Sequence, residues 1–124
     1  MGTFQVAVEI GSSDGSQWEF VEALVDTGAS HSIFPASLLH QLGIESTETW
    51  PFRLADERQR EFGIGQARMR MFGRERVSTV VFGDDTMQPI LGATTLEDFM
   101  LAVDPVRQTL VEVPGLLMYL EPED

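Results

Sequence analysis

Cysteine is absent from the sequence, which excludes disulfide bonds and thiolate metal sites. Basic side chains are scarce: 8 lysines and arginines stand against 20 aspartates and glutamates, and the net charge is −12. Nucleic acids and anionic membranes attract clustered lysine and arginine. We therefore expect neither nucleic acid nor a membrane as a partner, and we take the acidic surface as a source of solubility.

Long apolar runs are also missing, because none approaches the length of a membrane-spanning helix. The N-terminus has no basic region followed by an apolar core, so we expect no signal peptide and a cytoplasmic protein. The only histidines, His31 and His40, lack the spacing of zinc ligands and are predicted to be surface or capping groups. With no phosphate loop or dinucleotide fingerprint either, we predict neither a metal nor a cofactor.

The composition is that of a globular protein, with 43% hydrophobic and 23% charged residues. The length of 124 residues indicates a single domain over residues 1–124, with a core over about 3–113 and a tail over 114–124. Within the tail, the apolar stretch 116–119 is predicted to pack against the domain.

Alternating apolar residues and turn signals predict a mainly β protein with many short strands, a barrel or a sandwich. Two short helices are expected, one over 36–42 with Pro35 at its start and Gly43 at its end, and one over 95–100 from the capping-box spacing of Thr94 and Glu97. The expected strands cover 3–10, 18–25, 32–34, 88–91, 101–104 and 109–113, and two hairpins occupy 49–82 with breaks near 56–59 and 73–74.

The most informative segment is Asp26-Thr27-Gly28, which follows an apolar, β-prone stretch. We expect Gly28 to allow a tight turn with positive φ, so that a rigid strand presents the aspartate at a bend. Asp26, Ser30 and His31 supply the residue types of a hydrolase triad. They lie within six residues of one another, whereas a triad is brought together from separate segments, so we set this reading aside.

Four segments, at 23–30, 53–56, 90–96 and 101–105, carry a family resemblance. The sequence resembles the retropepsin-like aspartic peptidases, most closely their small single-domain bacterial and archaeal members, over about residues 3–113. The resemblance implies a closed, barrel-like β fold with one or two short helices and an aspartic endopeptidase that acts as a homodimer on peptides. Each chain would supply one catalytic aspartate, and two carboxylates about 3 Å apart would share a proton and activate a water.

The resemblance assigns roles to individual positions. Asp26 would be the catalytic aspartate. Thr27 would make a hydrogen bond across the dimer, and Gly28 would lend its backbone to the carboxylate and the substrate. The remaining implied positions are Ala29 and Ser30 in the loop near the peptide, and Ile90, Leu91 and Gly92 as a buttress beneath the loop.

The family also closes a hairpin flap over its substrate, and two placements compete. A glycine-containing tip at 63–65 lies too near 90–92 to leave room for the returning strand, so we favour a tip at 56–59. A charged tip departs from the glycines of retroviral flaps. The flap candidates are Trp50, Phe52 and Leu54 on the leading strand and Asp56, Glu57 and Arg58 at the tip, with Trp50 and Phe52 placed equally well in the core or against substrate.

Two functions remain at this stage. One is the aspartic endopeptidase. The alternative is a catalytically silent peptide-binding or assembly module on the same fold, which the charged flap tip would suit.

Overall fold

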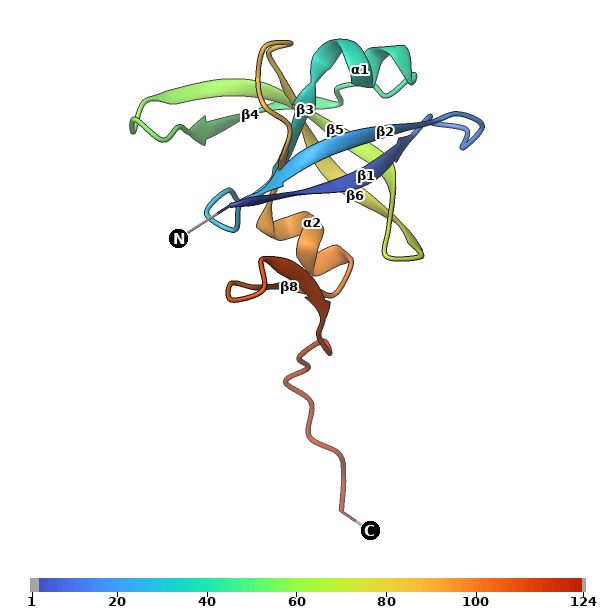
Figure 1. Cartoon of the computed structure of the whole chain (residues 1–124), viewed down its shortest axis with the longest axis vertical. Helices are drawn as coiled ribbons and strands as arrows, with labels where there is room; N and C mark the ends of the chain where they lie inside the picture. Colours follow the sequence, from blue (N-terminus) through green and yellow to red (C-terminus); the bar gives the residue numbers. More distant parts are fainter. Residues whose placement is uncertain (1–2, 124) are drawn as a thin grey trace.

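The computed structural model describes residues 3–123, which form nine strands and two short helices (Figure 1). The fold is therefore mainly β, as predicted. The strands are β1 (Phe4–Gly11), β2 (Trp18–Val25), β3 (Ser32–Pro35), β4 (Glu48–Arg53), β5 (Gln59–Met71), β6 (Arg74–Gly83), β7 (Ile90–Leu91), β8 (Leu101–Asp104) and β9 (Thr109–Glu112), and the helices are α1 (Ala36–Gln41) and α2 (Ala93–Asp98).

Seven strands form one sheet in the order β1-β2-β7-β3-β6-β5-β4, and β8 and β9 form a separate hairpin. A further antiparallel pairing joins β1 to β5 at residues 9–11 and 68–70. The strand pairings thus run in a closed circuit from which only β4 stands out as an added edge. Inside the circuit, β2 with β7 and β3 with β6 pair in parallel, while the neighbouring hairpins are antiparallel.

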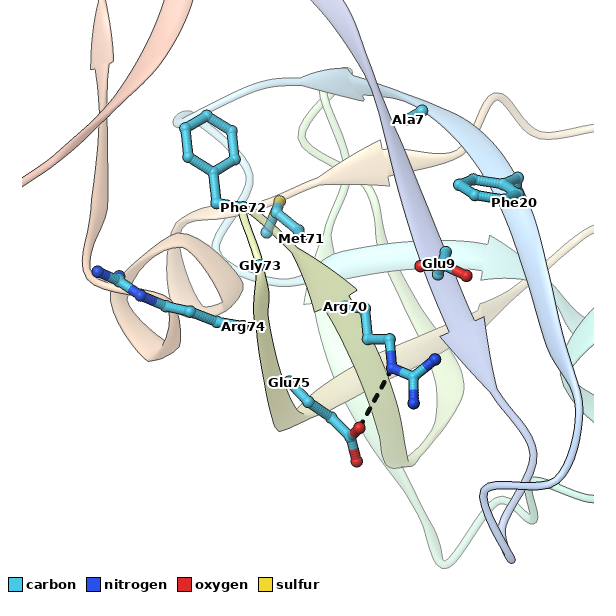
Figure 2. A pocket seen from close by; sticks show the side chains of 9 residues that line it. All are labelled: Ala7, Glu9, Phe20, Arg70, Met71, Phe72, Gly73, Arg74 and Glu75. Atoms are coloured by element: carbon cyan, nitrogen blue, oxygen red, sulfur yellow. Dashed lines mark hydrogen bonds and ion pairs between the residues drawn. The ribbon is translucent and has the colours of Figure 1, made fainter.

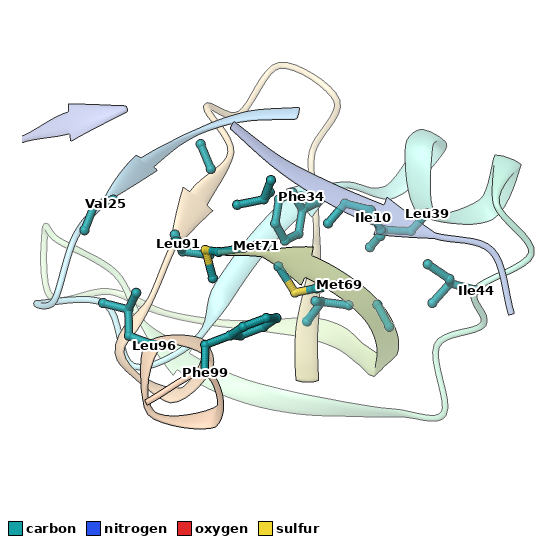
Figure 3. Packing of buried hydrophobic residues seen from close by; sticks show 14 of the residues in the cluster. Ile10, Val25, Phe34, Leu39, Ile44, Met69, Met71, Leu91, Leu96 and Phe99 are labelled. Atoms are coloured by element: carbon teal, nitrogen blue, oxygen red, sulfur yellow. The ribbon is translucent and has the colours of Figure 1, made fainter. Parts of the chain in front are cut away.

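The core lies inside this circuit and continues beneath both helices (Figure 3). On β1 the predicted alternation is confirmed, since Val8 and Ile10 are fully buried and Phe4 and Val6 pack partly against them. The largest fully buried side chains are Phe34, Phe99, Ile10, Leu39, Met69 and Leu91. These come from strands and helices far apart in sequence, so the core fixes the positions of the loops between them.

Helix α1 agrees closely with the prediction. Pro35 is its N-cap rather than its first helical residue, and Gly43 follows the C-cap with a φ of 75°. Glycine is favoured there because other residues are strained in the left-handed region. Leu39 and Leu42 are buried and fix the helix on the core.

Helix α2 differs from the prediction. It covers Ala93–Asp98 rather than 95–100, its N-cap is Gly92, and no side chain caps it. The capping box of Thr94 and Glu97 does not form, because the backbone N–H groups of the first turn already donate to carbonyls of the loop after β2. A loop distant in sequence therefore caps this helix, which local spacing could not indicate.

The apolar tail was also predicted wrongly. The side chains of 116–120 are 69–97% exposed, and the segment extends away from the domain (Figure 1). Only its beginning is attached, through the Val113 N–H, which donates to the Met100 carbonyl at 3.0 Å. No helix within residues 3–123 is long and apolar enough to cross a membrane.

Candidate active site

Asp26 follows the last residue of β2 and is held from two sides. Its backbone N–H donates to the Leu91 carbonyl at 3.1 Å, which extends the parallel pairing of β2 with β7. Its side-chain Oδ1 accepts the Gly28 N–H at 2.9 Å, and its carbonyl accepts the Ala29 N–H at 3.1 Å. The carboxylate therefore stands at the start of a tight turn with one oxygen already oriented.

Gly28 does not have the positive φ that was predicted. The glycines with positive φ are Gly15, Gly43 and Gly73, and Gly28 is not among them. A Cβ at Gly28 would instead lie 3.1 Å from the Oδ1 of Asp26, which is closer than ordinary contact. What matters at this position is the small space beside the carboxylate.

The loop after Asp26 rests on the start of α2. The Ala29 and Ser30 carbonyls accept the backbone N–H groups of Ala93 and Thr94 at 2.8 and 2.9 Å. Gly92 lies so close beneath the loop that a Cβ there would meet the His31 carbonyl group. Leu91 and Gly92 therefore contact the Asp26 loop through backbone atoms.

A pocket of about 470 Å³ opens beside this loop. Its walls are mostly apolar and come from the Asp26 loop, β3, the β4–β5 hairpin, β6 and β7. The lining residues are Gly28, Ala29, Ser30, His31, Ile33, Phe52, Arg53, Leu54, Phe62, Val81, Met87, Gln88 and Ile90. Ligand sites in proteins are typically concave and mostly apolar in this way.

His31 is not the surface or capping group that was predicted. It is half-buried in the pocket wall, its ring is edge-on to Phe52 at 5.5 Å, and its Nδ1 lies 2.8 Å from the Ser30 Oγ. The Oδ1 of Asp26 binds the Gly28 N–H, and no hydrogen bond within residues 3–123 joins it to this pair. His40, in contrast, is exposed in the last turn of α1 and packs on Phe82 at 5.3 Å.

The predicted hairpin is present, since β4 and β5 pair in register from Arg53 with Gln59 to Glu48 with Ile64. Residues 63–65 lie inside β5, bonded to β4 or β6 on either side, so they form no tip. The six flap candidates fall into two groups in the structure, those that line the pocket and those that lie outside it. Phe52 and Leu54 line the pocket, whereas Trp50 is 54% exposed and, like the charged tip at 56–58, lies outside it. At that tip the Asp56 carboxylate binds the Arg58 side chain at 2.6 Å.

Asp26 and Thr27 do not line this pocket and instead line a smaller hollow of about 160 Å³. Its other walls are the start of β1 and the tip of the β8–β9 hairpin. The remaining lining residues are Thr3, Phe4, Val25, Val103 and Pro105. Residues 28–30 of the loop thus face the larger pocket, whereas Asp26 and Thr27 face the hollow formed with β1 and the β8–β9 hairpin.

A second large pocket, also about 470 Å³, lies where β1 and β5 diverge (Figure 2). Three of its four charged side chains are engaged in ion pairs: Arg70 pairs with Glu75 at 3.2 Å, and Arg74 with Glu112 at 3.2 Å. It shares no residue with the Asp26 loop. Within residues 3–123, no three His, Asp or Glu side chains are grouped to hold a metal ion.

Comparison with known proteins identifies the family. A family model described as gag-polyprotein putative aspartyl protease matches residues 16–98, more than half of the chain and all of the Asp26 loop. The chain belongs to this aspartyl protease family. No curated protein sequence matches it.

Solved structures of retropepsin-like proteases share the fold of this family member. The retroviral protease-like domain of Ddi1 from Leishmania major is 19% identical, with a TM-score of 0.59 over 90% of this chain and 89% of that one. A retropepsin-like aspartic protease from Rickettsia conorii is 20% identical, with a TM-score of 0.52 over 84% and 89%. Simian foamy virus (mac) protease is 14% identical, with a TM-score of 0.54 over 78% and 96%.

Some residues at this site had escaped the sequence reasoning. His31 lies in the pocket wall. The buried hydroxyls of Ser32, Thr95 and Ser78 are hydrogen-bonded in series, and the first of them accepts the Gly92 N–H. A serine or threonine within a strand or helix carries no local signal of such a contact, because its partner comes from another segment. Only the position of Ser32 in an otherwise apolar strand, next to the Asp26 loop, could have drawn attention to it.

Proposed function

We propose that this family member is an aspartic endopeptidase in which Asp26 is the catalytic residue. The observation that carries the proposal is the Asp26 carboxylate, whose Oδ1 accepts the N–H of Gly28, a residue that lines the apolar pocket although Asp26 itself does not. Both residues lie within the span matched by the family model. One face of the loop meets a peptide-sized groove. The other face, at Thr27, meets a hollow formed with the chain's first strand and last hairpin.

Asp-Thr-Gly occurs once in the sequence, so one chain supplies one carboxylate. We propose that two chains pair at the Thr27 face to bring two Asp26 carboxylates together. Two such groups in contact cannot both ionise, so the dyad keeps one proton. The ionised member takes a proton from a water, while the protonated member donates to the carbonyl oxygen of the scissile bond.

The other assigned residues act on the substrate and the loop in this proposal. The Gly28 backbone and the Ala29–Ser30 segment border the peptide, and Phe52 and Leu54 form the hairpin side of the groove. Residues 90–92 hold the loop through backbone contacts and take no part in the chemistry. The single-domain organisation over 1–124 and a cytoplasmic location stay predictions from the sequence.

The test is digestion of a peptide library by the wild type and by Asp26→Asn across pH 3 to 7. We expect cleavage by the wild type on the acidic side of this range and none by the variant. The amide still accepts the Gly28 N–H, so the fold is kept. Asp85→Asn makes the same chemical change in an exposed turn, and we expect it to leave cleavage unchanged.

Sedimentation of both proteins, and mixing of the two, address the dimer. If the site is shared, added Asp26→Asn chains lower the activity of each wild-type chain, because mixed pairs carry one carboxylate. Full activity of Asp26→Asn would refute the catalytic assignment. Peptide binding without cleavage by the wild type would instead favour the silent binding module.

A further inference from the structure

The Asp26 loop is connected to the surface of α2 by a chain of buried hydrogen bonds. The Gly92 N–H donates to the Ser32 Oγ at 3.0 Å, and that oxygen lies 2.6 Å from the Thr95 Oγ1. Thr95 in turn lies 3.0 Å from the Ser78 Oγ, which donates to the Asp98 Oδ2 at 2.8 Å. The three hydroxyl-bearing residues are at most 1% exposed, so water does not compete for the bonds among them, and only the Asp98 end of the series meets solvent.

This series of hydrogen bonds ends at the peptide group between Leu91 and Gly92, which also binds the Asp26 backbone. The Leu91 carbonyl accepts the Asp26 N–H, and the N–H of that same peptide group, on Gly92, donates to Ser32. Rotation of this peptide plane would break both bonds together. The Ser32 hydroxyl therefore helps to set the orientation of the carbonyl that positions the Asp26 backbone.

The direction in which the hydroxyl groups donate along this series of hydrogen bonds follows from the groups at its two ends. An ionised Asp98 only accepts, so Ser78 donates to it and must accept from Thr95. Thr95 then accepts from Ser32, and Ser32, whose proton is used, accepts from the Gly92 N–H. Each group donates once and accepts once, and bonds aligned in this way strengthen one another. If Asp98 donated instead, the hydroxyl protons would be reversed, and Ser32 would accept from both Thr95 and the Gly92 N–H while its own proton had no acceptor within this series of groups.

We propose that Thr95 is a positioning residue for the Asp26 loop, and that the Asp98 carboxylate fixes the direction of the hydrogen bonds that reach the loop through it. The effect on catalysis rests on the proposed function. The effect on the loop itself does not, since it concerns only the backbone at Gly92 and Asp26.

The variants that test this are Thr95→Val, which keeps the shape and removes the hydroxyl, and Thr95→Ser, which restores it. At the far end, Asp98→Ala removes the last acceptor. Glu97→Ala is its matched control, because it removes an equal charge from the adjacent exposed position of α2. The Glu97 side chain takes no part in the series of hydrogen bonds. Asp98 is exposed, so its variant tests the proposal even if Thr95→Val fails to fold.

The first measurement is amide hydrogen exchange of the full-length protein by NMR. We expect the Gly92 and Asp26 amides to exchange about tenfold faster in Thr95→Val and in Asp98→Ala, the size of effect expected for one lost hydrogen bond. Thr95→Ser and Glu97→Ala should keep the wild-type rates. Unchanged exchange in both Thr95→Val and Asp98→Ala would overturn the proposal.

The second measurement is peptide cleavage. A displaced aspartate loses catalysis more than binding, so kcat should fall about tenfold in Thr95→Val with KM within about twofold. Thr95→Ser should recover kcat. A serine variant as impaired as the valine variant would show that packing, not the hydroxyl, matters. If the wild type cleaves nothing, the proposed function fails, while the exchange rates still decide the positioning role.

Discussion

Replacement of Gly92 by alanine is the most direct probe of how the Asp26 loop is supported. The added Cβ would lie 2.5 Å from the His31 carbonyl carbon and 2.9 Å from the Ala29 carbonyl oxygen. Both are backbone atoms, so no flexible side chain can move aside. The loop, the start of α2, or both must shift to accommodate one methyl group.

The cost follows from this crowding. Overpacking of a buried site typically costs about 1–3 kcal/mol in the free energy of unfolding. For a domain of this size, that corresponds to a fall in Tm of roughly 4–12 °C. Because the His31 and Ala29 carbonyls belong to the loop that follows Asp26, we also expect peptide cleavage to fall while the protein remains folded at 25 °C.

Urea denaturation followed by circular dichroism measures the loss, and a peptide assay at 25 °C measures activity. Gly115→Ala is the matched control. Its Cβ would be 3.4 Å from the Met100 Cε, the movable end of a side chain, so stability should change by less than about 0.5 kcal/mol. A Gly92→Ala protein as stable and active as that control would refute the view that close backbone contact supports the loop.

Two further outcomes are expected. Hydrogen bonds from the side chain and backbone of Ser16, then from Ser12, lower the pKa of Asp14 to about 2. Since its folded pKa lies below the ordinary 3.8, this turn is stabilised above that value and loses the effect as the pH falls through about 2. NMR titration should show the Asp14 pKa rising in Ser16→Ala, and an unchanged pKa would contradict the assignment. Deletion of residues 116–124 should leave Tm within about 2 °C, because the apolar side chains at 116–120 are exposed. A larger fall in Tm would show that the tail packs in solution.

The sequence predicted the parts of the fold that local chemistry determines. The alternation of apolar and polar residues predicted β1 and β2, and turn residues predicted the breaks between β4, β5 and β6. Helix α1 was found because Pro35 and Gly43 mark its ends. In each of these, the residues that form the element also carry its signal.

The errors have the opposite origin. The start of α2 is set by carbonyls of residues 29 and 30, more than sixty positions earlier in the chain, and not by its own capping residues. The tail at 116–120 is apolar enough to pack, but in this structure it has no surface against it. His31 enters the pocket because Phe52 lies opposite on another strand. Contacts between distant segments decided all three, and a single sequence does not display such contacts.

The Asp26 loop does not need a carboxylate in order to fold. Its shape depends on backbone bonds to Leu91 and α2 and on one acceptor, the Oδ1 of Asp26, for the Gly28 N–H. Asparagine or serine side chains make the same turn, so folding does not require a carboxylate here. A negative charge beside an apolar groove, in a chain that already carries a net charge of −12, adds further like-charge repulsion. The proposed catalytic role would account for the aspartate at this position, and Asp26→Asn, which keeps the turn and removes the charge, is therefore the decisive variant.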